Sequence, residues 1–153
     1  MGAGAMTRRV LHLDDDPTIT RLVHEGLVRY DFETLPIHDP ELLIPTLVDQ
    51  GIRVVLLDID LGTDKTGLDW LVDLKRMDGG IQVVMLTGLV TNHSVLAAMR
   101  NGAADCLFKP VDSLSAVAQA LDGAFAFADH WKFRLHELNR RLQRSGQPAL
   151  AGR

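Results

Sequence analysis

Polar side chains follow four of the short apolar runs in this 153-residue sequence. In chain order they are Asp14-Asp15-Asp16, Asp58 with Asp60, Thr87-Gly88 and Lys109-Pro110. Ligands of doubly wound sheets bind beyond the carboxyl ends of the strands, so we expect these groups to meet at one edge. Two carboxylates about 4 Å apart repel by about 4 kcal/mol at an effective dielectric of about 20. A hard divalent cation relieves that repulsion, and all-oxygen ligands select Mg²⁺ over softer metals.

Such an edge carries the groups needed for phosphoryl transfer to a carboxylate. Lys109 supplies a fixed positive charge, Thr87 can donate a hydrogen bond, and a carboxylate beside a metal can attack phosphorus in line. A single aspartate at a strand end is more often a helix N-cap, and we expect that role for Asp16 and Asp39. Because the four groups follow the runs of the first, third, fourth and fifth strands, the set as a whole favours a functional site.

The elements that position these groups alternate between apolar runs and helical periods. The runs of the first, third, fourth and fifth strands cover residues 10–13, 54–57, 81–86 and 106–108. A weaker run at 32–38 contains Pro36, which suits an edge strand. Four to six continuous apolar residues indicate strands buried on both faces, and the intervening helical periods predict a doubly wound α/β sheet.

Helix starts and stripes are visible between the runs. Asp-Pro pairs at 16–17 and 39–40 predict two helix starts, and Pro45 should kink or shorten the second helix. Apolar residues recur at helical spacing in three stripes: Ile19, Leu22, Val23 and Leu27, then Leu68, Leu71 and Val72, then Val95, Leu96 and Met99. The last of these should end at Asn101-Gly102.

Composition narrows the class of protein. Hydrophobic residues make up 46% and charged residues 24%, values that exclude a wholly disordered chain. The net charge of −4 gives no general attraction for nucleic acid or an anionic membrane, and we expect neither as a partner. One cysteine favours a reducing, cytoplasmic setting. We expect a cloning remnant or disorder at 1–6, one domain at 7–128 and a disordered tail at 145–153.

The last predicted helix continues past that domain. Its apolar residues alternate at spacings of three and four: Leu114, Val117, Leu121, Ala124, Ala128, Trp131, Leu135, Leu138 and Leu142. The pattern spans 29 residues, or about 43 Å, and a sheet this small covers about half of it. Residues 129–144 therefore extend the helix, as a coiled coil that forms a homodimer, as a helix folded back on its own domain, or as the end of a fragment.

The ordered set of motifs resembles the receiver domains of two-component response regulators, which have the CheY-like, chemotaxis-type fold. The matching segments are Val10-Leu11-His12-Leu13-Asp14-Asp15-Asp16-Pro17, Val54-Val55-Leu56-Leu57-Asp58, Met85-Leu86-Thr87-Gly88 and Leu107-Phe108-Lys109-Pro110. The resemblance covers about residues 8–128. It implies a flavodoxin-like fold, with a five-stranded parallel sheet in the order 2-1-3-4-5.

The resemblance also implies roles for the site residues. Asp58 is the phosphoacceptor, and a phosphohistidine on a sensor histidine kinase or a phosphotransfer protein is the donor. Thr87 reorients to bond the phosphoryl group, and Lys109 pairs with it beside a cis peptide bond to Pro110. The domain catalyses only its own phosphorylation and dephosphorylation, and it signals to a downstream protein effector through its fourth helix and fifth strand.

The same resemblance implies the metal ligands. Asp14, Asp15 and Asp58 hold Mg²⁺ together with the backbone carbonyl of Asp60. The side chain of Asp60 adds a carboxylate that the family pattern does not require.

Three features depart from the family pattern. Cys106 stands where the family has a Tyr or Phe whose ring moves with the threonine, so the usual aromatic relay is in doubt. Gly62 replaces a common proline, and the segment from Asp58 to Gly67 is one residue longer than usual. We expect a looser loop there.

Two other functions fit parts of the sequence. The segment Asp58-Ile59-Asp60-Leu61-Gly62-Thr63 is similar to the opening motif of haloacid-dehalogenase-type phosphatases, in which a second aspartate is the acid/base. Those enzymes complete the metal site with a downstream acid pair, and nothing after Lys109 offers one. The other alternative is a docking module that does not respond to phosphate, which Cys106 leaves open.

Overall fold

The protein is seen in a computed structural model that describes residues 7–88, 91–111 and 113–148. The expectations for residues 1–6 and 149–153 lie outside these ranges. Five parallel strands form one sheet in the order β2-β1-β3-β4-β5. The strands are β1 (Arg8–Leu13), β2 (Phe32–Ile37), β3 (Val54–Leu57), β4 (Gln82–Thr87) and β5 (Asp105–Phe108). The predicted fold class and strand order are confirmed, and the strand that contains Pro36 lies at an edge.

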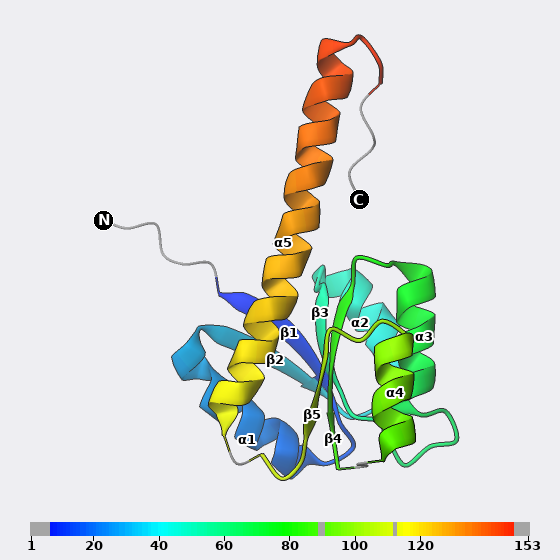
Figure 1. Cartoon of the computed structure of the whole chain (residues 1–153). Helices are drawn as coiled ribbons and strands as arrows, with labels where there is room; N and C mark the ends of the chain where they lie inside the picture. The colour runs from blue at the N-terminus through cyan, green and yellow to red at the C-terminus, as the bar shows by residue number, and fades with distance from the viewer. Residues whose placement is uncertain (1–6, 89–90, 112, 149–153) are drawn as a thin grey trace.

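Helices cover both faces of the sheet (Figure 1). They are α1 (Pro17–Leu27), α2 (Leu43–Gln50), α3 (Gly67–Met77), α4 (Asn92–Arg100) and α5 (Leu114–Arg144), with short 3₁₀ turns at Val28–Tyr30 and Pro40–Leu42. Buried side chains of α1 and α5 pack with one face of the sheet, and those of α2, α3 and α4 pack with the other. Two layers of helices therefore enclose the strands, as their apolar runs predict.

The helix starts follow the sequence signals. The side chain of Asp16 accepts a hydrogen bond from the Thr18 amide at 2.9 Å, and that of Asp39 accepts one from the Glu41 amide at 3.0 Å. Both residues are the predicted N-caps. Pro45 is the third residue of α2, which has only 8 residues and follows a 3₁₀ turn. A proline is tolerated in a first turn because its missing amide has no partner there.

The buried face of α4 does not follow its apolar stripe. Leu96 and Met99 belong to the stripe seen in the sequence, but they are 42% and 65% exposed. The buried residues of α4 are Ser94 and Ala98, so small side chains hold this helix close to the sheet. A stripe chosen by residue hydrophobicity alone selects the wrong face here, because burial follows the surface that the helix meets. Leu96, Met99 and the 44% exposed Phe108 of β5 are called the α4–β5 patch below.

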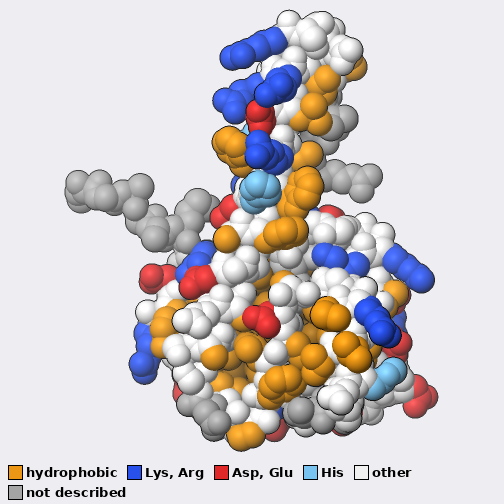
Figure 2. All heavy atoms as spheres, in the orientation of Figure 1, with side chains coloured by type: hydrophobic (Ala, Val, Ile, Leu, Met, Phe, Trp, Pro, Cys, Tyr) orange, Lys and Arg blue, Asp and Glu red, His pale blue; other side chains and the backbone are white. Residues whose placement is uncertain are grey.

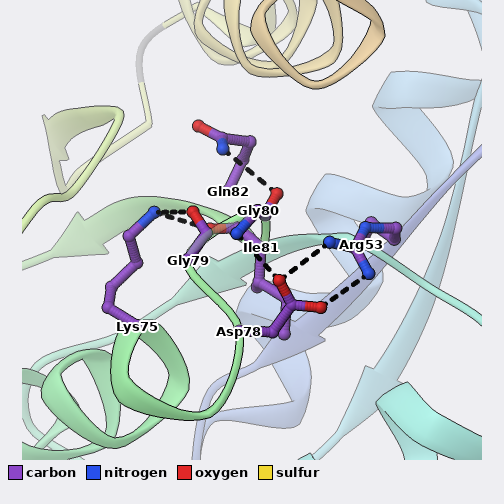
Figure 3. Close-up of polar contacts among 7 residues, drawn as sticks. All are labelled: Arg53, Lys75, Asp78, Gly79, Gly80, Ile81 and Gln82. Carbon is purple, nitrogen blue, oxygen red and sulfur yellow. Dashed lines mark hydrogen bonds and ion pairs between the residues drawn. The ribbon is translucent and has the colours of Figure 1, made fainter. Parts of the chain in front are cut away.

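The amino ends of β3 and β4 are fixed by polar contacts, which Figure 3 shows. Lys75, near the end of α3, donates hydrogen bonds to the carbonyls of Gly79 and Ile81 at 2.8 and 2.9 Å. Asp78 pairs with both terminal nitrogens of Arg53 at 2.8 and 3.0 Å. These contacts hold the α3–β4 connection at the amino ends of the strands. The polar groups identified in the sequence follow the carboxyl ends, on the opposite side of the sheet.

The helix α5 leaves the domain halfway along its length (Figure 1). Its buried residues are Val117, Ala118, Ala120, Leu121 and Ala124, all in its first half. The second half projects beyond the sheet, where Trp131 and Leu135 are 53% and 52% exposed. Within the described residues, no helix is long and apolar enough to cross a membrane.

The strand β1 contains one buried polar side chain, that of His12. His12 is fully buried, and neither of its ring nitrogens has a hydrogen-bond partner among the described residues. Burial, with the nearby positive charge of Lys109, lowers the pKa of His12 to about 3. The imidazole is therefore neutral in the folded protein at any pH near neutrality. An unsatisfied buried polar group costs about 1–3 kcal/mol, so His12 destabilises the fold.

We expect the substitution His12→Leu to raise the free energy of unfolding by about 1–3 kcal/mol at neutral pH. The difference should widen as the pH falls, because the unfolded histidine binds a proton below about pH 6.5 and the folded one does not. At about pH 5 this proton adds about 2 kcal/mol to the gap. Urea unfolding of both proteins without Mg²⁺ would measure it. Parallel stability curves between pH 7 and 5 would contradict the assignment.

Candidate functional site

The acidic residues meet where β1 and β3 end. The amide of Asp58 donates to the carbonyl of Leu13 at 3.0 Å, which carries the pairing of β1 and β3 one residue past the strand. Asp58 therefore lies beside Asp14. The carboxylate of Asp14 is oriented in turn, because its Oδ1 accepts a hydrogen bond from the Asp16 amide at 2.9 Å. Asp14 and Asp58 are both buried, at 0% and 4% exposure.

Lys109 reaches these carboxylates from the end of β5. Its Nζ lies 2.6 Å from Oδ2 of Asp14 and 2.9 Å from Oδ2 of Asp58. The backbone of Lys109 is anchored as well, because its amide donates to the Thr87 carbonyl at 2.9 Å. The peptide bond from Lys109 to Pro110 is cis, as the resemblance implies. One ammonium group thus bridges two buried carboxylates from strands far apart in sequence.

Burial sets the ionisation of this group of charges. Burial raises the pKa of Asp58, and the neighbouring charge of Asp14 adds to the rise, while Lys109 and a hydrogen bond with Thr87 oppose it. The pKa of Asp14 is raised for the same leading reason and is likewise opposed by Lys109. Burial alone would lower the pKa of Lys109, but the two carboxylates outweigh it and raise that pKa. Perturbation of this kind clusters at functional sites.

Three carboxylates form a group that fits a metal ion. One ligand oxygen from each of Asp14, Asp15 and Asp58 lies within 4.8 Å of the others. The first and third are buried and Asp15 is exposed, so the group opens toward solvent. Oδ1 of Asp58 is buried and has no hydrogen-bond partner in the part of the chain that the structure describes. A buried carboxylate oxygen without a donor, in an all-oxygen group, suits a hard divalent cation such as Mg²⁺.

The side chain of Asp60 does not join this group. It is exposed, and its Oδ1 accepts a hydrogen bond from the Gly62 amide at 3.1 Å. An acid/base of the phosphatase kind would have to face the phosphoryl group, so this orientation speaks against the haloacid-dehalogenase alternative. The expected contribution of the Asp60 backbone carbonyl to the metal site stays a prediction.

The loop after Asp58 is held at two points that the sequence analysis did not identify. The amide of Gly67 donates to the carbonyl of Ile59 at 2.7 Å. Lys65 lies over the ring of Trp70, with Nζ 3.5 Å from the ring centroid, and also pairs with Asp73. Both contacts join the loop to α3 or to the end of β3. The spacing of the loop gave no signal for them, because they depend on how α3 packs.

Thr87 and Cys106 lie on neighbouring strands. Thr87 ends β4, is fully buried and is opposite Phe108 in the register of β4 with β5. Cys106 is half-buried, and burial raises the pKa of its thiol. Cys106 packs against the core on the side of α2, α3 and α4. The structure thus brings Asp14, Asp15, Asp58, Thr87 and Lys109 to one edge, as predicted.

Comparison with known proteins identifies the family that this arrangement matches. A sequence model described as "Response regulator receiver domain" matches residues 10–121. The chain is 30% identical to the DNA-binding response regulator MtrA of Mycolicibacterium smegmatis over 74% of its own length and 49% of that protein. It is 32% identical to the transcriptional regulatory protein CpxR of Klebsiella pneumoniae, over 80% of its own length and 51% of that protein. The chain thus spans about half the length of these curated relatives.

Solved structures agree with the sequence matches. The receiver domain of NtrX from Brucella abortus is 33% identical, with a TM-score of 0.65, over 74% of this chain and 98% of that one. A CheY-like receiver domain protein from Methanospirillum hungatei has a TM-score of 0.71 over 80% of this chain and 98% of its own. At 20% identity the second likeness shows the fold alone.

The contact between Gly67 and the site can be tested. A Cβ atom at Gly67 would lie 1.9 Å from the carbonyl oxygen of Asp58, so Gly67→Ala must displace the backbone that carries this carboxylate. We expect a loss of about 1–3 kcal/mol of unfolding free energy, together with weaker Mg²⁺ binding.

The matched control is Gly123→Ala in α5, where a Cβ atom would meet nothing within 4 Å. This variant should gain about 0.5–1 kcal/mol, because alanine is the better helix former. Urea unfolding and a Mg²⁺ titration would measure both effects. A Gly67→Ala protein as stable as the wild type would contradict the proposed packing.

Proposed function

This chain belongs to the response regulator receiver family, and we propose that it acts there as a phosphoacceptor modified on Asp58. The observation that carries the proposal is the bridge from Lys109 to Asp14 and Asp58 beside the three-carboxylate group. The donor would be a phosphohistidine on a sensor histidine kinase or a phosphotransfer protein in the cytoplasm. The domain is a signalling module rather than an enzyme that acts on other substrates.

The transfer step follows from the positions of the groups. An oxygen of the Asp58 carboxylate attacks phosphorus as a new O–P bond forms and the P–N bond to the donor imidazole breaks. The imidazole leaves with the electron pair of that bond. Lys109, held 2.9 Å from Asp58, can follow the negative charge from the carboxylate to the phosphoryl oxygens. Thr87 would donate a hydrogen bond to the same oxygens.

Asp14, Asp15 and Asp58, with the backbone carbonyl of Asp60, are the groups that would hold Mg²⁺. Bound there, the ion would neutralise charge on the phosphoryl group during transfer. The carboxylates need such a cation because Lys109 supplies only one positive charge to three acids.

We propose that output passes through protein–protein contact. Phosphorylation adds about −1.5 to −2 of charge at the edge where β4 and β5 end. The neighbouring surface is the α4–β5 patch, which is apolar and exposed. MtrA is named as a DNA-binding protein, but only about half of it is matched, so DNA contact is not carried over to these residues.

The phosphoacceptor is tested by the substitution Asp58→Asn, which keeps the shape of the side chain and removes its nucleophile. Acetyl phosphate with Mg²⁺ should label the wild type once and leave this variant unlabelled, as measured by mass spectrometry of the intact protein. A chelator should abolish labelling of the wild type. The matched control is Asp60→Asn, two residues away and exposed, which should still be labelled. Unchanged labelling of Asp58→Asn would refute the assignment.

The role of Lys109 is tested by Lys109→Ala. Without the ammonium group the two carboxylates repel directly, which should raise the pKa of Asp58 further and slow labelling by roughly 100-fold. Mg²⁺ binding should be retained. Amide hydrogen exchange across α4 and β5 should respond to beryllofluoride with Mg²⁺ in the wild type and not in the variant. A normal exchange response in the variant would show that Lys109 has no role in the conformational switch. The absence of a response in the wild type would favour a phosphate-independent docking module.

A further inference from the structure

We infer that the projecting half of α5 pairs with the same segment of a second copy of this chain, as a parallel two-stranded coiled coil. The surface concerned is the extension stripe, defined as Ala128, Trp131, Leu135, Leu138 and Leu142. The pairing is separate from the phosphoacceptor chemistry and does not rest on it.

The extension stripe continues the pattern that packs α5 on its own sheet. Val117, Leu121 and Ala124 are buried there at 0–2% exposure, and the same spacing of three and four continues without a break to Leu142. In the projecting half the large side chains of this pattern are left exposed by the described residues: Trp131 is 53%, Leu135 52% and Leu138 41% exposed. Apolar residues at alternating spacings of three and four are the a and d positions of a coiled coil.

The extension stripe turns toward the side of the molecule that carries the α4–β5 patch. A seven-residue repeat on an α-helix drifts by about 20° per heptad, so the stripe rotates by about 40° between Leu121 and Leu135. The drift runs away from Asp122, which pairs with Arg8 of β1 and marks the β1 side of α5. Figures 1 and 2 show β5 and α4 on the other side, with apolar side chains there and along the projecting helix.

The area available matches what a stable dimer needs only if both apolar surfaces take part. Phe127 packs against Trp131, with ring centroids 6.3 Å apart, and widens the stripe. A half-exposed large side chain offers roughly 100 Å², so the stripe with Phe127 offers roughly 400 Å² and the α4–β5 patch adds roughly 300 Å². The total approaches the approximately 800 Å² per partner of a standard interface. A second copy facing this side would cover both surfaces at once.

Charges beside the extension stripe select the parallel direction. In a parallel pair each g residue faces the e residue of the next heptad in the second copy. Arg134 would therefore face Asn139, and Phe127 would face Lys132, with no like charges opposed. In an antiparallel pair the two g rows face each other, which places Arg134 against Arg134 or Arg141 of the second copy. Glu137 pairs with Arg134 and Arg141 of its own helix, at 3.0 and 2.9 Å, on the side away from the second copy. It therefore does not screen these arginines from the arginines that would face them in an antiparallel pair.

The full chain without a phosphodonor is the test sample. Light scattering should give twice the chain mass of 16.9 kDa at high concentration and the monomer on dilution. Leu135→Lys places an unpaired charge in the seam and should weaken dimerisation by about 100-fold or more. Phe133→Lys is the matched control, because Phe133 is 57% exposed on the opposite side of the same helix, and it should leave the dimer intact.

Direction is measured separately, in a Cys106→Ser background that removes the one native thiol. Leu138→Cys should then form a disulfide with its own counterpart, since identical d residues meet in a parallel pair. Cross-linking only between Leu135→Cys and Leu138→Cys proteins in a mixture would show an antiparallel pair and overturn the inferred direction.

Three other results would overturn the pairing itself. A monomer at every concentration would do so, and so would a dimer that persists in Leu135→Lys. A monomer that sediments with phosphatidylglycerol vesicles through the stripe would assign this surface to a lipid bilayer instead. Asp58→Asn leaves the stripe unchanged and should still dimerise, so failure of the pairing is distinguishable from failure of the phosphoacceptor assignment.

Discussion

The site depends on two buried carboxylates that share one ammonium group. Asp14 and Asp58 lie at the ends of adjacent strands, where neither can move away without breaking the pairing of β1 with β3. Burial in the domain penalises their charged forms, and Lys109 at 2.6 and 2.9 Å offsets the penalty only in part. The carboxyl ends of these strands therefore hold an excess of negative charge. A bound cation or a covalent modification of Asp58 would change that excess strongly. The proposed phosphorylation of Asp58 would add further negative charge to this group.

The rest of the fold holds these three charges in position. β1, β3 and β5 supply one residue each, and the parallel arrangement brings their carboxyl ends to the same edge. The tight approach of Gly67 to the Asp58 carbonyl fixes the start of α3 beside Asp58. His12 shows that the sheet tolerates a polar residue at a cost in stability. The amino edge, closed by Arg53, Asp78 and Lys75, is spatially separate from this chemistry.

The helix α5 packs on its own sheet with its first half and leaves its second half exposed, because the helix is longer than the sheet. The buried residues of α5 end at Ala124, yet the helix continues to Arg144 with the same apolar spacing. Phe108 of β5, with Leu96 and Met99 of α4, leaves a second apolar surface exposed. A partner that covered only one of the two would leave the other in contact with water. This geometry connects the fold of one domain to its association with another.

Much of this protein was determined by its sequence. Apolar runs predicted the strands, and Asp-Pro pairs predicted two helix starts. The order of the acids, Thr87 and Lys109 predicted which groups lie together at the strand ends. Short-range propensity and the residues at strand ends are local properties. The tertiary structure decided what depends on a facing surface. It exposed Leu96 and Met99, buried Ser94 instead, and turned the Asp60 side chain away from the acids. It also placed Lys65 on Trp70 and packed Gly67 against Asp58. Such contacts join residues through the packing of whole elements, and no pattern of residue types along the chain encodes that packing directly.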